Sequence, residues 1–150
     1  MELRDVLLVI HIAGAGSWLG ANLLQAVVPS MAAKQGVEAA AGWFRVAGEL
    51  SKKFYMPVST VLLATGIWMV LLDDSISFEN VFVVIGIGMI VVGALLGIFV
   101  FEPGSEEAAT AVESGDEARL KAAVGKIARF GTIDTLLLIV TISVMVIRLR

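Results

Sequence analysis

The chain has 150 residues, of which 58% are hydrophobic and 17% charged, and its mean hydropathy is +0.91. Soluble domains average about 25% charged residues, so this composition excludes an ordinary soluble domain. The absence of cysteine excludes disulfides, iron–sulfur clusters and thiolate metal sites, and a net charge of −3 without a basic tract gives no reason to expect nucleic acid as a partner.

Four apolar stretches have about the length that a helix needs to cross the roughly 30 Å hydrocarbon core of a bilayer. The first is residues 6–28, which we expect to end at Pro29 and which holds the only histidine of the chain. At 100° per residue, its polar side chains gather on one face of a helix: His11, Trp18, Asn22 and Gln25. Gly16 and Gly20 fall on the opposite face. We therefore expect the polar face to point into a helix bundle and the glycine face to allow close helix contact.

A polar connection, residues 30–53, separates the first span from the second. Hydrophobic residues at steps of three and four predict an amphipathic helix that lies at the interface or extends the next span: Trp43, Val46, Leu50 and Phe54. The second predicted span is residues 55–72. Pro57 lies in its first turn, where the missing N–H costs little.

A short acidic link without Lys or Arg leads to the third predicted span, residues 81–101, and we expect Pro103 to end it. A polar connection at residues 104–129 begins acidic and finishes basic. The fourth span is residues 130–147. The prediction is therefore an all-α fold with a single domain, an integral membrane four-helix bundle in which the connections are partly helical.

The distribution of Lys and Arg predicts the orientation. Four spans place both termini and the acidic link on one side of the membrane and the two long connections on the other. The connections carry eight Lys and Arg residues: Lys34, Arg45, Lys52, Lys53, Arg119, Lys121, Lys126 and Arg129. The opposite side carries three: Arg4, Arg148 and Arg150. Since positively charged loops stay inside, we expect both termini outside.

A weak internal repeat predicts how the spans pair. A shift of 76 residues aligns Lys53 with Arg129, Phe54 with Phe130, Thr65 with Thr141, and Met69 with Met145. The chain then divides into two helical hairpins, each made of a span, a long connection and a second span. The pairs Gly16/Gly20 and Gly93/Gly97 would let helices pack closely, inside one chain or between protomers of a homo-oligomer or larger complex.

His11 is the first candidate for chemistry, and two interpretations are open. It is either a polar group satisfied by a Ser or Thr of a neighbouring helix, or a metal or haem ligand, because imidazole is the commonest metal-binding side chain. Met69, Met89 and Met145 fall in the same outer half of the bundle, one on each of the other spans. Imidazole and thioether groups together suit Cu(I), while methionine also fills gaps in apolar cores.

Asp134 is the second ionisable group inside a predicted span. Because it lies near the start of the fourth span, we expect the helix dipole to stabilise its charge, or the carboxylate to pair with Arg129 or Lys53. A proton-relay role is the alternative. Asn22 and Gln25 are expected to hydrogen-bond across helices.

Several motifs of enzymes are missing from the sequence. It contains no GxSxG, Walker loop or HExxH, so it predicts neither a hydrolase nor an ATPase. A single histidine also excludes haem held by two histidines of one chain. A haem would need His11 with a methionine, a five-coordinate iron, or two chains that meet symmetrically.

The segment HIAGAGSWLG places His11 seven residues before a Trp–x–Gly formed by Trp18 and Gly20. It resembles the first-span pattern of the copper-resistance protein D (CopD) superfamily, in particular its short four-span members of unknown function. The segment PVSTVLLATGIW, the stretch GDEARL and Met145 also look like this family. The resemblance implies a four-helix bundle in the bacterial cytoplasmic membrane, with copper handling proposed for CopD itself.

The same pattern is similar, more weakly, to the HemJ family, a haem-linked protoporphyrinogen oxidase family in which the first-span histidine is a proposed haem ligand. That residue would be His11 here. This chain departs from HemJ because it has no intramembrane lysine, and from copper-transport members because it has no further histidine.

The leading hypothesis is a non-enzymatic membrane protein that binds or passes copper, or holds a haem b, at a site that includes His11. Met69, Met89 and Met145 are further candidates for that site. The first alternative is a cofactor-free accessory or scaffold subunit of a membrane complex. The second is a haem-dependent oxidoreductase.

Overall fold

A computed structural model of the chain describes residues 2–147, and every regular element in that range is helical. The six α-helices are α1 (Leu3–Gln35), α2 (Val37–Leu50), α3 (Met56–Leu71), α4 (Val81–Leu96), α5 (Glu102–Ser114) and α6 (Glu117–Ile147). Two π-helical turns connect some of them: η1 (Ser51–Tyr55) joins α2 to α3, and η2 (Gly97–Phe101) joins α4 to α5. The described chain therefore forms four long helices, each long and apolar enough to cross a membrane.

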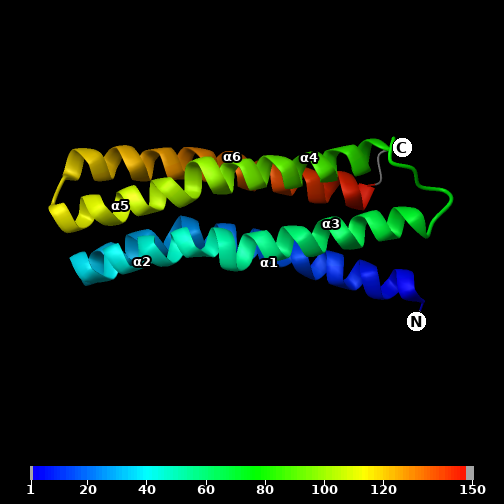
Figure 1. Ribbon diagram of the computed structural model, residues 1–150, viewed down its shortest axis with the longest axis horizontal. Coiled ribbons are helices and arrows are strands. Elements are labelled where there is room, and N and C mark those ends of the chain that lie inside the picture. Colours follow the sequence, from blue (N-terminus) through cyan, green and yellow to red (C-terminus); the bar gives the residue numbers. More distant parts are fainter. Residues whose placement is uncertain (1, 148–150) are drawn as a thin grey trace.

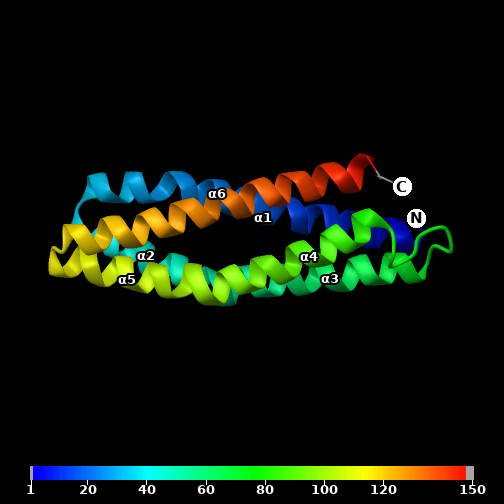
Figure 2. The ribbon, with the colours of Figure 1, turned by 90° about the horizontal axis from the view of Figure 1, so that it is seen from above.

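The four long helices form two hairpins that pack side by side (Figure 1). The first hairpin turns at Gly36 and the second at Gly115, where φ is +115° and +68°. Residues with a Cβ rarely adopt such angles, so glycine allows these turns to be very short. The start of α1, the end of α6 and the α3–α4 loop lie at one end of the bundle (Figure 2). The predicted all-α membrane bundle of two hairpins is confirmed.

Two predicted helix ends are wrong, because the helices continue through their prolines. Pro29 lies inside α1, which runs on to Gln35. Pro103 lies in the first turn of α5, directly after η2. There the Glu102 N–H donates to the Gly97 carbonyl, one residue further back than in an α-helix. Each proline removes a hydrogen bond, but neighbouring helices hold the long helix together. At Pro103 the π turn η2 also accommodates the change.

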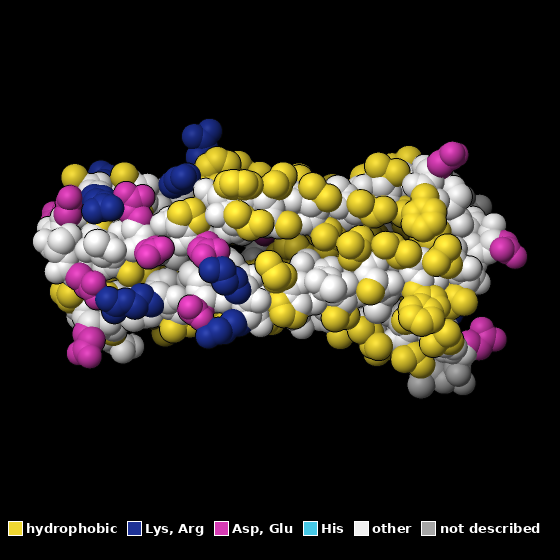
Figure 3. All heavy atoms as spheres, in the orientation of Figure 1, with side chains coloured by type: hydrophobic (Ala, Val, Ile, Leu, Met, Phe, Trp, Pro, Cys, Tyr) yellow, Lys and Arg dark blue, Asp and Glu magenta, His cyan; other side chains and the backbone are white. Residues whose placement is uncertain are grey.

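Charge divides the bundle into two halves along its length. Figure 3 shows Lys, Arg, Asp and Glu gathered over the half that contains α2 and α5, and hydrophobic side chains over the half that contains α3 and α4. The long helices have 31 to 35 residues, which is about 50 Å at 1.5 Å per residue, against roughly 30 Å of hydrocarbon. The half with α3 and α4 (the membrane half) therefore spans the bilayer. The other half (the polar half) continues the same helices beyond it.

The polar half is built from the two stretches expected to be connections, residues 30–53 and 104–129, and both are almost entirely helical. Its core is small: Phe44, Ala108, Ala109 and Ala123 are buried together where α2, α5 and α6 meet. Small side chains let helices approach closely. Ion pairs such as Lys52 Nζ to Glu102 Oε1 at 2.5 Å lie on its surface, where each contributes at most about 1 kcal/mol.

The chain is thus a small multi-pass membrane protein whose apolar outer surface suits contact with lipid. Its orientation stays a prediction from the count of Lys and Arg. Of the residues in that count, Arg148 and Arg150 lie outside the part of the chain that the structure describes.

Candidate functional site

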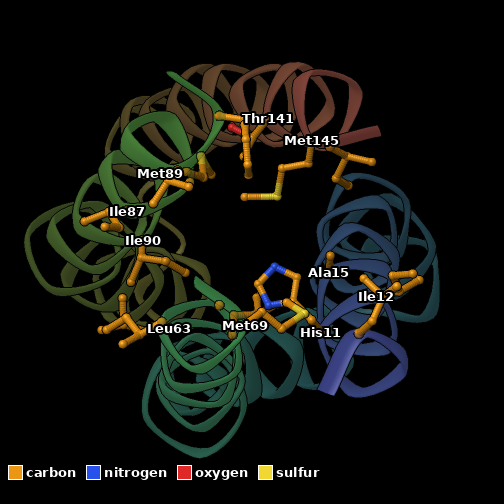
Figure 4. A pocket seen from close by; sticks show the side chains of 18 of the residues that line it. His11, Ile12, Ala15, Leu63, Met69, Ile87, Met89, Ile90, Thr141 and Met145 are labelled. Carbon is orange, nitrogen blue, oxygen red and sulfur yellow. The ribbon is translucent and has the colours of Figure 1, made fainter. Parts of the chain in front are cut away.

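The membrane half contains a partly open cavity of about 620 Å³ between α1, α3, α4 and α6. Figure 4 looks into it and shows side chains from all four helices around an open centre. Its lining is almost wholly apolar, and four described residues bring nitrogen or oxygen side-chain atoms to it: Arg4, His11, Trp18 and Thr141. Ligand sites typically have volumes of about 300–1,000 Å³ and an apolar lining with a few polar groups. The cavity has the size and composition of a small-molecule site.

His11 projects from α1 into this cavity (Figure 4). Its Nδ1 lies 2.9 Å from Thr65 Oγ1, and the Thr65 hydroxyl donates its proton to the Val61 carbonyl at 2.7 Å. The distance fits either imidazole tautomer. In the tautomer that carries its hydrogen on Nδ1, the imidazole donates to Thr65 and Nε2 keeps a free lone pair. Histidine ligands of metals are commonly oriented in this way by a hydrogen bond from the second ring nitrogen.

The three methionines singled out from the sequence line the same cavity as His11. Met69 belongs to α3, Met89 to α4 and Met145 to α6, so each long helix contributes one possible ligand. Met145 reaches into the cavity across from His11 (Figure 4). The described residues hold no cluster of three or more His, Cys, Asp or Glu side chains that could bind a metal ion. Any metal here would depend on imidazole and thioether groups.

Glycines make room for the large side chains inside the membrane half. A Cβ on Gly66 would lie 3.2 Å from His11 Cε1, and a Cβ on Gly86 would collide with Met145 Cε. A Cβ on Gly93 would lie 2.6 Å from Trp18 Cζ2. The face of α4 that carries Gly86 and Gly93 therefore serves contacts within the chain.

The other predicted glycine contact differs. A Cβ on Gly16 or Gly20 would meet nothing within 4 Å, so neither glycine supports a close helix contact within the described chain. A Cβ on Gly97 would come within 4.0 Å of Ser51 Oγ on η1. Of the two glycine pairs, the Gly93/Gly97 pair is the one that neighbouring elements approach.

A polar network lies beneath the cavity, on the side of the polar half. Asn22 Nδ2 donates to Asp134 Oδ2 at 2.8 Å, and the Tyr55 hydroxyl donates to Asn22 Oδ1 at 2.9 Å. Gln25 Nε2 donates to the same hydroxyl at 2.9 Å. Trp18 is 3% exposed and packs edge-on against Tyr55, with ring centroids 5.9 Å apart. The network joins α1, η1 and α6, and both amides hydrogen-bond across helices.

The environment expected for Asp134 is wrong, because α6 begins at Glu117 and Asp134 lies far from its first turn. The carboxylate accepts from Asn22, not from a cation, and Lys53 pairs with Glu49 instead. Asp134 is 2% exposed, and its Oδ1 has no hydrogen-bond partner in the described structure. The start of a hydrophobic stretch did not mark the start of a helix, since the polar half is helical too.

We expect Asp134→Leu to lower the free energy of unfolding by about 1–3 kcal/mol, because the partly buried Asn22 amide loses its acceptor at 2.8 Å and keeps only the longer bond to Thr135 Oγ1 at 3.3 Å. Asp134→Asn keeps an oxygen acceptor and should lose less. Thr132→Leu is the matched control, because Thr132 is exposed on the same helix. Denaturation of the three variants in detergent measures the difference, and equal stability of Asp134→Leu and the control would contradict the role of the network.

Three residues of the site were not found from the sequence: Arg4, Thr65 and Tyr55. A signal existed for Arg4, because Arg4, His11, Trp18 and Gln25 recur every seven residues and so share a face of α1. Thr65 and Tyr55 gave no such signal, because each hydrogen-bonds to side chains of α1 but lies on another element of the chain.

The cavity offers one imidazole nitrogen, three thioether sulfurs and a large apolar volume. Imidazole and thioether ligands suit Cu(I), and imidazole with thioether is also an axial pair of haem iron. The residues present therefore fit either group. Comparison with family models, curated proteins and solved structures finds no match to this chain.

Proposed function

We propose that this protein is a non-enzymatic membrane protein that holds a haem in the cavity of its membrane half, with His11 Nε2 as an axial ligand. The observation that carries the proposal is the hydrogen bond between His11 Nδ1 and Thr65 Oγ1, which in the Nδ1-protonated tautomer leaves a lone pair on Nε2 beside the apolar cavity. A volume of about 620 Å³ suits an organic cofactor better than a bare ion.

Met145 is the sixth-ligand candidate, because it enters the cavity across from His11 (Figure 4). A haem held by His and Met supplies one-electron redox chemistry at a raised potential. The chain's own part is to orient the imidazole, to surround the macrocycle with apolar side chains and to exclude water.

Cu(I) is the second candidate, favoured by the placement of one imidazole and three methionines around one cavity, with one residue from each long helix. Soft thioether ligands favour Cu(I). The resemblance to the CopD superfamily supports copper, and the similarity of the first span to HemJ supports haem at His11. Both resemblances also favour the bacterial cytoplasmic membrane, and the excess of Lys and Arg in the polar half favours termini outside.

An absorption spectrum with metal analysis of detergent-purified protein from its native host tests the proposal. A Soret band with stoichiometric iron is expected. Stoichiometric copper without that band would replace haem by Cu(I). A colourless, metal-free protein would overturn both and favour the cofactor-free scaffold.

Replacing the proposed sixth ligand gives a finer prediction. Met145→Leu keeps the size of the side chain but removes the sulfur, so we expect the haem to stay bound while its spectrum changes to that of five-coordinate iron. Met31→Leu is the matched control, because Met31 is exposed near the C-terminal end of α1. Identical spectra for the two variants would exclude Met145 as a ligand.

A further inference from the structure

The cavity of the membrane half lies between the two hairpins, not within either of them. Inside each hairpin the helices are in close contact: a Cβ on Gly14 of α1 would lie 3.1 Å from a side chain of α3, and one on Gly86 of α4 would collide with Met145 of α6. Beneath the cavity the hairpins meet, because the indole of Trp18 on α1 lies against the backbone of α4 at Gly93. Between that contact and the α3–α4 loop, the centre of the bundle is open (Figure 4).

The cavity reaches the outer surface of the membrane half. Its lining includes residues that are also exposed on the outside of three helices: Ile12 and Gly16 of α1, Ile67 of α3 and Ile87 of α4. A Cβ on Gly16 would meet nothing within 4 Å, so no other part of the described chain covers α1 at this residue. In a bilayer, the surface of the membrane half is surrounded by acyl chains. The cavity is therefore open to the lipid phase at the side of the bundle.

The lining favours an apolar occupant over water. Two of its polar side chains are hydrogen-bonded within the protein: His11 Nδ1 lies 2.9 Å from Thr65 Oγ1, and the Thr141 hydroxyl donates to the Leu137 carbonyl at 2.8 Å. A buried water needs two to four polar partners, and most of the lining consists of apolar side chains. An empty cavity would deprive these side chains of dispersion contacts. A flexible hydrocarbon chain supplies those contacts without requiring a hydrogen bond.

The length of the cavity matches that of an acyl chain. Along α1 the lining runs from Arg4 to Leu19, which is about 22 Å at 1.5 Å per residue, while the hydrocarbon of one leaflet is about 15 Å thick. A lipid with its headgroup at the end of the bundle that carries the α3–α4 loop can therefore place a whole chain in the cavity. A helix of a partner protein is about 10 Å wide and would need more than the volume of about 620 Å³ over that length.

We infer that the cavity binds one acyl chain of a membrane phospholipid, which enters sideways between the two hairpins. The inference goes beyond the proposed function, because it assigns a ligand that the bilayer itself supplies and a route into the cavity. It also stands if the protein carries no haem. A haem in the same cavity would have to displace the chain.

Native mass spectrometry tests this inference on the full chain, reconstituted with dioleoylphosphatidylcholine and then transferred to detergent. We expect one retained lipid per wild-type chain. Ala15→Phe combined with Thr141→Phe fills the cavity from α1 and α6 (Figure 4) and should weaken lipid binding at least about tenfold. Ala13→Phe combined with Val140→Phe adds the same rings to exposed positions of the same two helices and should retain lipid as the wild-type chain does. A wild-type chain without lipid, or equal retention by both double variants, would overturn the inference.

Fluorescence quenching gives a second measurement that leaves the cavity unchanged. Trp43→Phe combined with Trp68→Phe leaves Trp18 as the only tryptophan, 3% exposed and at the inner end of the cavity. Phospholipids brominated near the ends of their acyl chains should quench it, because a chain in the cavity brings bromine into contact with the indole. Trp43→Phe alone keeps the exposed Trp68 as a positive control for contact with lipid. Quenching of Trp68 without quenching of Trp18 would show that no chain enters, whatever the stability of the filled variant.

Discussion

The Gly93→Ala variant is expected to be about 2–3 kcal/mol less stable to unfolding than the wild-type chain. A Cβ at this position would lie 2.6 Å from Trp18 Cζ2 and 2.7 Å from Trp18 Cη2, closer than carbon atoms pack. The indole is a rigid ring, 3% exposed, in the core with Leu62, Met89 and Leu138. To make room, the indole would have to shift against these neighbours or into the cavity that it lines, and overpacking costs about 1–3 kcal/mol.

Gly88→Ala provides the matched control on the same helix. A Cβ at Gly88 would meet nothing within 4 Å, and alanine is the better helix former by about 1 kcal/mol, so Gly88→Ala should be as stable as the wild-type chain or slightly more stable. Thermal or denaturant unfolding in detergent measures both variants. Equal stability of the two would mean that Trp18 does not pack against α4 as described.

Thr65→Val is expected to weaken binding of the proposed haem by about 10- to 100-fold, the usual effect of removing the hydrogen-bond partner of a ligating histidine. Valine nearly matches threonine in shape but has no oxygen, so His11 Nδ1 loses its acceptor at 2.9 Å. The ring is then free to rotate or to change tautomer, which removes the fixed lone pair on Nε2.

Thr65→Ser separates the hydrogen bond from the packing, because serine keeps the hydroxyl and loses a methyl group. Its affinity should stay within a few-fold of the wild-type value. Titration of haem, followed by its absorption, measures both variants. Loss of affinity in Thr65→Ser equal to that in Thr65→Val would show that packing, not the acceptor, matters at this position.

The sequence predicted the architecture well because membrane spans depend on simple physical quantities. Apolar length and the absence of charge located four helices, and alternation of spans with long connections predicted the hairpins. Helix ends were harder, since Pro29 and Pro103 stop most helices but not these. A long helix in a bundle is held by its neighbours, and no local signal of the sequence records that packing.

Part of the candidate site was predictable because helical periodicity determines which residues share a face. That periodicity predicted that His11, Trp18 and Asn22 share one side of α1. In the structure all three contact residues of other helical elements. Contacts between helices were not predictable in the same way. The bond from His11 to Thr65 and the bond from Asn22 to Asp134 join residues 54 and 112 positions apart, and they depend on the relative depth and rotation of whole helices.

The split of the bundle into two halves has a consequence for the site. The polar half is packed around small alanine side chains, while the membrane half leaves a cavity framed by glycines. Because the same long helices run through both halves, the cavity and the small-residue core are built from different stretches of the same helices, so the cavity lies in the membrane half alone.

The most direct test of the central claim is the absorption spectrum of His11→Gly purified from the native host, recorded before and after addition of imidazole. Removing the side chain should abolish the Soret band expected of the wild-type protein. Free imidazole fits the space left behind and should restore the band when haem is supplied. A His11→Gly protein that keeps its band without imidazole, or a wild-type protein that has none, would contradict the account.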